Sequence, residues 1–163
     1  MKDLFIVRHA KSSWDAPELS DHDRPLNRRG KRDAPRMAQW LFEYGRIPDR
    51  IVSSTAKRAR KTAEEIANRC GVAERLELNR ELYFGDPESW VELLRNTETE
   101  VVCVMLVGHN PGVEDFLEQL TGQYERLPTA AIAHVELPVE SWRDISIEGG
   151  GRLVTVQRPK ELL

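Results

Sequence analysis

The chain has few cysteines, no long apolar run and no excess of positive charge. Its two cysteines, Cys70 and Cys103, sit in apolar patterns without CxxC or Cys/His spacing, which predicts buried thiols rather than a disulfide or a zinc site. With 24 Lys+Arg against 27 Asp+Glu, the chain lacks the basic excess of a dedicated nucleic-acid binder. The longest apolar run, residues 101–107, is far shorter than the ~18–20 residues that span a bilayer.

The N-terminal segment also lacks the pattern of a signal peptide. Its apolar stretch, residues 4–7, is short and is followed at once by Arg8 and His9. We therefore expect a cytoplasmic protein that binds neither nucleic acid nor membrane. Its 163 residues, of which 40% are hydrophobic, fit one globular domain of ordinary composition. We expect a single domain over residues 1–163, with one principal site.

Short apolar runs alternate with stretches of helical periodicity along the chain. We expect strands near residues 4–7, 50–53, 76–78, 101–107, 130–137 and 153–156, with helices between them. Asn27 is expected to cap the first long helix and Gly45 to end it, while Asn110 and Pro111 are expected to cap and open the last one. This alternation predicts an α/β protein, a three-layer αβα sandwich with a central, largely parallel sheet.

Several polar residues have plain structural interpretations. Arg28, Arg32 and Arg36 recur four residues apart on the first helix, which is more typical of a solvated face than of a binding patch. His22 lies in an Asp-rich loop and His134 lies within a strand pattern. We interpret both histidines as structural or surface residues.

Other polar side chains come where strands end. Arg8 and His9 follow the first strand, Arg58 lies in the first turn of the second long helix, and His109 follows the central strand. The carboxyl ends of parallel strands share one edge of a sheet, so we expect these side chains to converge. Guanidinium groups and helix N-termini bind oxyanions such as phosphate, and a neutral imidazole can act as a nucleophile. The pattern predicts a phosphoryl site.

Three motifs resemble those of the histidine phosphatase (phosphoglycerate mutase-like) superfamily. They are Arg8-His9-Ala10, Ser54-x-Ala56-x-Arg58-Ala59-x-x-Thr62-Ala63 and Gly108-His109-Asn110-Pro111, in the family's order and approximate spacing. The compact length and the runs 8–14 and 21–26 are similar to those of the SixA-type phosphohistidine phosphatase branch. The resemblance implies a phosphoglycerate mutase-like fold and a phosphohistidine intermediate on His9. It also implies that Arg8, Arg58 and His109 hold the phosphoryl oxygens, and that no metal or organic cofactor is needed.

The sequence departs from the family's pattern in two places. Ala10 stands where glycine is commoner, and the chain is too short for the lid that carries a carboxylic general acid in larger relatives. Glu81 is the candidate general acid, because a relative's acid often lies in that part of the chain. The open alternatives are Asp21, Asp23, Asp86 or no acid at all. Imidazole leaves with a proton that it can carry near neutral pH, so a site without a strong acid would favour phosphohistidine.

These observations predict a metal-independent phosphatase that acts through a phosphohistidine intermediate on His9. Phosphohistidine in a protein is the first expected substrate class, and a small phosphorylated metabolite is the alternative. A non-catalytic phosphate-binding module is a rival from another class, but binding alone has no need of a nucleophile at His9. A metal-dependent hydrolase would need an HxH, an HxD or a carboxylate cluster beside His9 or His109, and the sequence has none.

Overall fold

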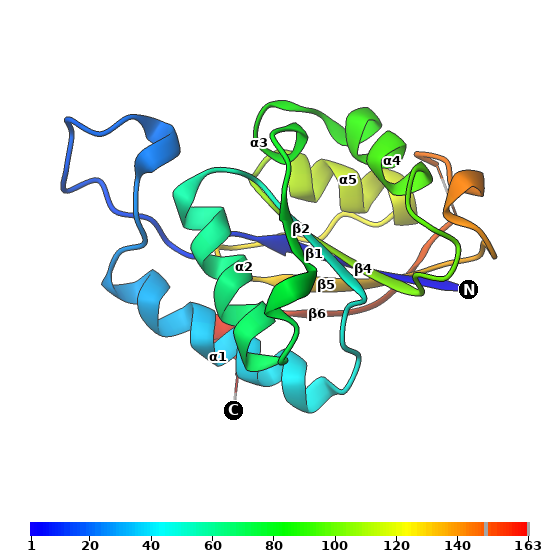
Figure 1. Ribbon diagram of the computed structural model, residues 1–163, viewed down its shortest axis with the longest axis horizontal. Helices are drawn as coiled ribbons and strands as arrows, with labels where there is room; N and C mark the ends of the chain where they lie inside the picture. The colour runs from blue at the N-terminus through cyan, green and yellow to red at the C-terminus, as the bar shows by residue number, and fades with distance from the viewer. Residues whose placement is uncertain (149, 163) are drawn as a thin grey trace.

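A computed structural model of the chain describes residues 1–148 and 150–162. At its centre is a six-stranded mixed sheet of order β3-β2-β4-β1-β5-β6 (Figure 1). The strands are β1 (Lys2–Arg8), β2 (Arg50–Ser53), β3 (Leu76–Leu78), β4 (Cys103–Gly108), β5 (Ile132–Leu137) and β6 (Arg152–Gln157). Strands β1 to β4 are parallel, and β5 pairs antiparallel with both β1 and β6. The expected, largely parallel sheet is confirmed.

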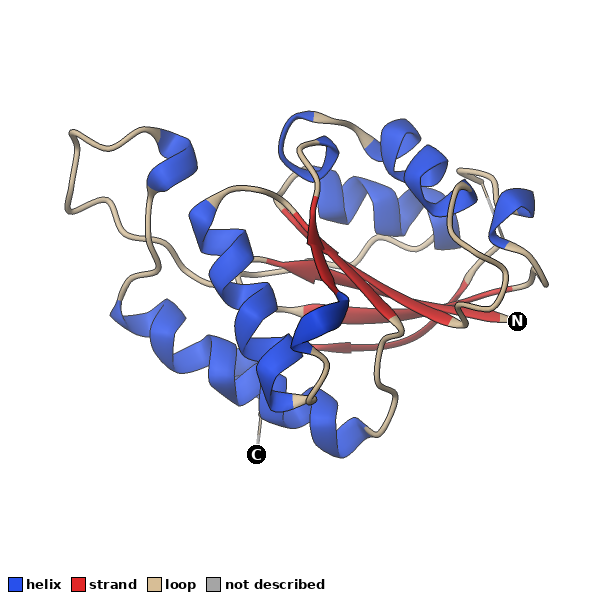
Figure 2. Ribbon diagram, viewed as in Figure 1, coloured by secondary structure: helices blue, strands red, loops and turns tan. Residues whose placement is uncertain are grey.

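Helices cover both faces of this sheet (Figure 2). They are α1 (Arg28–Tyr44), α2 (Lys57–Arg69), α3 (Glu81–Phe84), α4 (Pro87–Arg95) and α5 (Gly112–Thr121). Successive side chains of β1 point to opposite faces, so Phe5 and Val7 pack in the core under α1 and α2. Leu4 and Ile6 pack in the core under α4 and α5. The three-layer αβα prediction is thereby confirmed.

The ends of α1 follow the sequence, whereas the start of α5 does not. Asn27 caps α1 by accepting a hydrogen bond from the Gly30 N–H, and Gly45 ends it at φ +86°. Helix α5 begins at Gly112 with Pro111 as its N-cap residue, so the expected cap at Asn110 is wrong. The Asn110 side chain instead donates to the Leu127 carbonyl, 3.2 Å away. A long-range contact has replaced the local cap.

Of the cysteines and histidines interpreted as structural, Cys103 and His134 are buried, whereas Cys70 and the surface residue His22 are partly exposed. Both cysteines are free thiols; Cys103 is buried, as expected, but Cys70 is only partly buried because it is the C-cap residue of α2. His134 is buried between two hydrogen-bond partners, the Tyr44 hydroxyl at Nδ1 and the Asp3 carboxylate at Nε2, each 2.7 Å away. It also stacks on Phe5, and its structural interpretation is confirmed. None of the helices among residues 1–148 and 150–162 is long and apolar enough to cross a membrane.

Candidate active site

The structure brings the predicted site residues together at the carboxyl ends of β1, β2 and β4. His9 follows β1 and is only 7% exposed. Its Nδ1 lies 2.7 Å from the Ala10 carbonyl oxygen, which can only accept a hydrogen bond. Nδ1 must therefore carry the ring proton, and the lone pair of the neutral ring is left on Nε2. A fixed tautomer of this kind is what a nucleophilic imidazole requires.

Helix α2 holds the segment around His9 in place. The Thr62 hydroxyl accepts a hydrogen bond from the Ala10 N–H at 2.9 Å and donates to the Arg58 carbonyl at 2.8 Å. One buried hydroxyl thus ties the residue after His9 to the turn that carries Arg58. Thr62 is part of the second motif, but the sequence did not reveal this positioning contact.

His109 follows β4 and lies beside His9, with 4.9 Å between the ring centroids. Its Nε2 is 2.8 Å from the Ser54 hydroxyl, which also accepts a hydrogen bond from the Ala56 N–H. Ser54 can donate its own proton to Nε2, and in that tautomer the ring proton of His109 is on Nδ1. His109 can then act as a hydrogen-bond donor while it remains neutral.

Arg8 reaches the same place from the end of β1. One terminal nitrogen of its guanidinium donates to the Leu127 carbonyl at 3.1 Å. Within residues 1–148 and 150–162, the buried side-chain polar atoms without a hydrogen-bond partner are Arg8 Nε, His109 Nδ1 and Asn110 Oδ1. All three belong to this site. Buried donors are normally satisfied, so two unpaired ones at one place mark a position where an acceptor such as a phosphoryl oxygen fits.

Asp21 accepts hydrogen bonds from both terminal nitrogens of the Arg58 guanidinium. One terminal nitrogen of Arg58 donates to the Asp21 backbone carbonyl at 2.7 Å, and the other donates to Asp21 Oδ2 at 3.0 Å. The same carboxylate accepts hydrogen bonds from Arg24 at 2.8 Å and from the Tyr83 hydroxyl at 2.7 Å. Figure 1 shows the segment between β1 and α1, in blue, beside the start of α2. Arg24 and Tyr83 were not among the predicted site residues; Arg24 lies in the 21–26 run that carries the family resemblance.

Burial and positive charge set the protonation states of this site. Burial, reinforced by the nearby Arg58 and Arg8 charges, lowers the pKa of His9 to about 3, although the bond to Ala10 opposes the shift. Burial and Arg58 lower the pKa of His109 to about 4. Burial alone would raise the pKa of Asp21, but the bonds from Tyr83 and Arg58 outweigh it and lower this pKa to about 2. At neutral pH both imidazoles are neutral and Asp21 is ionised.

The candidate acid Glu81 lies on the same short helix as Tyr83, whose ring contacts His109. It is the exposed first residue of α3, and its backbone carbonyl accepts a hydrogen bond from the Trp90 indole. Across the residues that the structure describes, no hydrogen bond or ion pair joins its carboxylate to His9, Arg58 or His109. Of the alternatives, Asp23 is exposed and Asp86 caps α4. Only Asp21 bonds directly to a predicted phosphoryl-binding group.

No group of three or more His, Cys, Asp or Glu side chains that could hold a metal ion is present in the described part of the chain. What the site does offer is two guanidinium groups, a neutral histidine with a free N–H and a second histidine with a free lone pair. Such a set can bind a tetrahedral oxyanion and attack its central atom.

The fold and this donor set define an α/β protein with an oxyanion-binding pocket built around paired histidines. The model of the histidine phosphatase superfamily (branch 1) matches residues 4–102. The chain therefore belongs to the histidine phosphatase superfamily.

Relatives and solved structures match over nearly the whole chain. An uncharacterized chloroplastic protein of Arabidopsis thaliana is 32% identical, over 96% of this chain and 77% of its own length. Among solved structures, a SixA-named protein of Agrobacterium tumefaciens has a TM-score of 0.83 at 30% identity, covering 97% of this chain and 98% of its own. The protein histidine phosphatase SixA, in a complex with tungstate, has a TM-score of 0.82 at 28% identity, covering 97% of each chain. The expected family and phosphoglycerate mutase-like fold are confirmed.

Proposed function

We propose that this protein is a protein phosphohistidine phosphatase that works without a metal ion. The observation that carries the proposal is the state of His9, a buried neutral imidazole with Nδ1 tied to the Ala10 carbonyl and a lone pair on Nε2. Arg8, Arg58 and His109 surround it with hydrogen-bond donors. A pocket that only binds phosphate needs the donors but not the prepared nucleophile.

In the proposed first step, Nε2 of His9 attacks the phosphorus atom of the substrate. The bond from phosphorus to the substrate imidazole nitrogen breaks, and that imidazole leaves as the neutral ring after taking up a proton. In the second step a water attacks the phosphorus of phospho-His9, which releases inorganic phosphate and restores His9. Arg8, Arg58 and the Nδ1–H of His109 stabilise the charge on the transferring phosphoryl oxygens in both steps.

The proton supply of this site favours an imidazole leaving group. Asp21, the carboxylate nearest to the phosphoryl-binding groups, has its pKa lowered to about 2 and is ionised at neutral pH. An alkoxide leaving group would need a positioned acid, whereas imidazole is a good leaving group once protonated near pH 7. Glu81 stays the proposed acid for any ester substrate, and a small phosphorylated metabolite stays the alternative substrate class.

One of the solved structures supports this proposal. The SixA neighbour with bound tungstate is a protein histidine phosphatase, and tungstate is a tetrahedral oxyanion like phosphate. A mycobacterial glucosyl-3-phosphoglycerate phosphatase has the same fold at 17% identity, with a TM-score of 0.69. That likeness concerns the fold alone.

Trapping of the phosphoenzyme tests the proposal. The protein is mixed with a protein carrying ³²P-phosphohistidine in the presence of EDTA, quenched rapidly and separated. We expect label on the wild-type protein that is lost in acid and retained in alkali, as a P–N bond requires, and no label on His9→Asn. His134→Asn, which removes a histidine whose ring bonds Tyr44 and Asp3 rather than a site residue, is the matched control and should keep the label. An acid-stable adduct, or activity that needs a divalent ion, would contradict the mechanism.

A further inference from the structure

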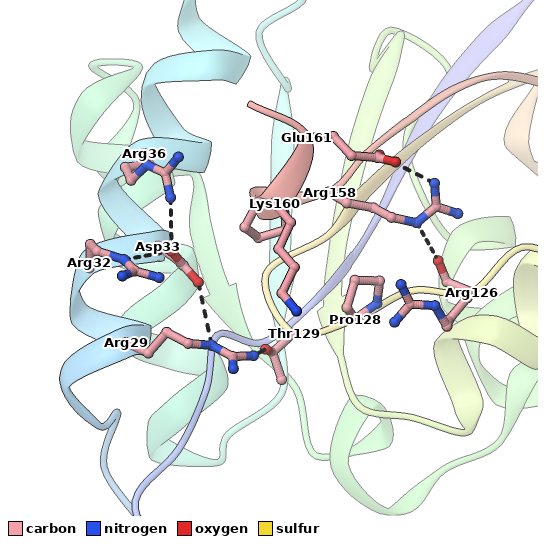
Figure 3. Close-up of a pocket in the computed structure, with 11 residues that line it drawn as sticks. Arg29, Arg32, Asp33, Arg36, Arg126, Pro128, Thr129, Arg158, Lys160 and Glu161 are labelled. Atoms are coloured by element: carbon pink, nitrogen blue, oxygen red, sulfur yellow. Dashed lines mark hydrogen bonds and ion pairs between the residues drawn. The ribbon is translucent and has the colours of Figure 1, made fainter. Parts of the chain in front are cut away.

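A basic cavity of about 530 Å³ lies between α1, the loop before β5 and the residues after β6 (Figure 3). Its wall contains six cationic side chains and two carboxylates, although the chain as a whole has a net charge of −3. The cations are Arg29, Arg32, Arg36, Arg126, Arg158 and Lys160. A concave surface with such a local excess of positive charge attracts anions.

One wall is built by α1 around a buried carboxylate. Asp33 has a side chain only 5% exposed, and it holds Arg29, Arg32 and Arg36 at 3.8, 3.2 and 3.2 Å. Each guanidinium has five N–H donors, so one contact to Asp33 leaves most of them available. Arg32 and Arg36 are exposed, as the sequence predicted, but they are gathered around Asp33 rather than spread as a simple solvated stripe. Asp33 fixes the direction of these cations.

The opposite wall comes from the loop before β5 and from the residues after β6. The Arg158 guanidinium donates to the Arg126 carbonyl at 3.0 Å and pairs with Glu161 at 3.4 Å. The side chains of Arg126 and Lys160 make no ion pair or hydrogen bond to any residue that the structure describes. Figure 3 shows the Lys160 amine pointing between the two walls toward Thr129. With respect to residues 1–148 and 150–162, these two cations are available to a ligand.

The cavity and the candidate active site share the loop of residues 127–130. On the cavity side, Thr129 accepts a hydrogen bond from Arg29 at 3.2 Å. On the other side, the Leu127 carbonyl accepts from Arg8, and the Ala130 N–H donates to the carbonyls of Arg8 and His9. This loop therefore joins the wall of the cavity to the backbone that carries Arg8 and His9.

The surroundings favour a macromolecular ligand. Trp14, whose ring packs against the Arg24 guanidinium, and Phe84, whose ring packs against Tyr83, are 71% and 68% exposed. Exposed aromatic and arginine side chains are typical of protein-binding surfaces. The six cations come from three separate segments of the chain, which suits several separate carboxylates better than one compact phosphate.

We propose that this basic cavity is a docking subsite for acidic side chains of the phosphoprotein whose phosphohistidine enters the His9 site. The proposal rests on the phosphohistidine phosphatase function proposed above. It adds a reason why one phosphohistidine protein would be preferred to another, because charge complementarity speeds encounter and selects partners.

Two synthetic peptides test the subsite. Both carry one phosphohistidine; in the acidic peptide it is flanked by Asp and Glu, and in the neutral peptide by Asn and Gln. We measure kcat/KM for both with the wild type and with the double variant Arg126→Glu/Lys160→Glu, which leaves Asp33 and its arginines untouched. The control is Lys61→Glu/Arg143→Glu, which makes the same charge change at two exposed positions outside the cavity.

We expect the wild type to prefer the acidic peptide by at least ~10-fold at low salt, and the cavity variant to lose this preference. The control variant should keep it. The ratio of the two rates is the readout, so a general loss of activity or stability cancels. A wild-type ratio near one, or a ratio that survives the cavity substitutions, overturns the proposal.

A binding measurement separates this proposal from the proposed function. The unphosphorylated peptides, labelled with a fluorophore, are titrated with the same proteins at low salt. If the wild type binds the acidic peptide more tightly, the cavity variant does not, and neither phosphopeptide is hydrolysed, the subsite is supported and the phosphatase function is contradicted.

Inorganic tripolyphosphate is titrated in the same way. If the wild type binds it, the cavity variant does not, and neither peptide is preferred, the cavity is a site for small polyanions and the docking proposal is overturned.

Discussion

The low pKa of His9 makes the stability of this protein depend on pH in a predictable way. An exposed histidine has a pKa near 6.5, whereas burial lowers that of His9 to about 3. Below pH 6.5 the unfolded chain binds a proton at this residue and the folded protein does not. Stability contributed by the neutral ring is therefore present above pH 6.5 and lost as the pH falls toward 3.

The size of the loss follows from the two pKa values. Each pH unit between them changes the free energy of unfolding by about 1.4 kcal/mol. From pH 7 to pH 5, His9 accordingly accounts for a loss of about 2 kcal/mol. His109, with its pKa lowered to about 4, accounts for a similar loss over the same interval. Asp21 adds little there, because its carboxyl group is ionised in both states above pH 5.

The assay is urea unfolding of the wild type and of His9→Asn at pH 7 and pH 5. Asparagine keeps an N–H near the position of Nδ1 but does not titrate. We expect the wild type to lose about 2 kcal/mol more than the variant between the two pH values. All other titrating groups are present in both proteins and cancel in the difference. Equal losses, or an NMR titration of the His9 ring with a midpoint near 6.5, would refute the reasoning.

Three further predictions concern single residues. Arg58→Lys keeps the positive charge but loses the bidentate fork of the guanidinium, so kcat/KM should fall by at least ~100-fold while the thermal midpoint barely moves. A fully active variant, or one that is unfolded, would show that Arg58 has a structural role instead. Glu81→Gln should impair hydrolysis of an alkyl phosphate but spare that of phosphohistidine, and equal losses on both substrates would argue against an acid role. His134→Leu leaves the buried Asp3 carboxylate without its imidazole partner, so urea unfolding should show a loss of roughly 1–3 kcal/mol with kcat/KM on phosphohistidine unchanged. A variant as stable as the wild type would contradict this account of the His134 contacts.

The positions of the predicted site residues follow from local patterns. His9 comes just after the first strand, and Arg58 lies in the first turn of a helix, so the βα order alone places both at the carboxyl edge of a parallel sheet. Periodicity and end signals likewise predicted α1, because Asn27 and Gly45 act within a few residues of the helix they bound. These features depend on short stretches of chain.

Which carboxylate meets the arginines is a tertiary property. The sequence favoured Glu81 as the candidate acid because of its place in the chain, yet Asp21 is the residue that bonds to Arg58. Asp21 lies in a long loop without periodicity, and no local signal indicates where such a loop folds back. The Asn110 cap failed for a similar reason, since the Leu127 carbonyl that binds the side chain is distant in sequence.

The sequence by itself therefore determined the order of the strands and the layered fold, because these depend on spacing along the chain. It also predicted that two histidines and two arginines lie at the carboxyl ends of the strands. Only the tertiary structure decided the tautomer of His9, the hydrogen bonds by which Thr62 links Ala10 to Arg58, and the basic cavity. The cavity joins α1, the loop before β5 and the residues after β6, which are far apart in sequence. They meet because β5 and β6 extend the sheet beside β1, so that both end segments pack next to α1.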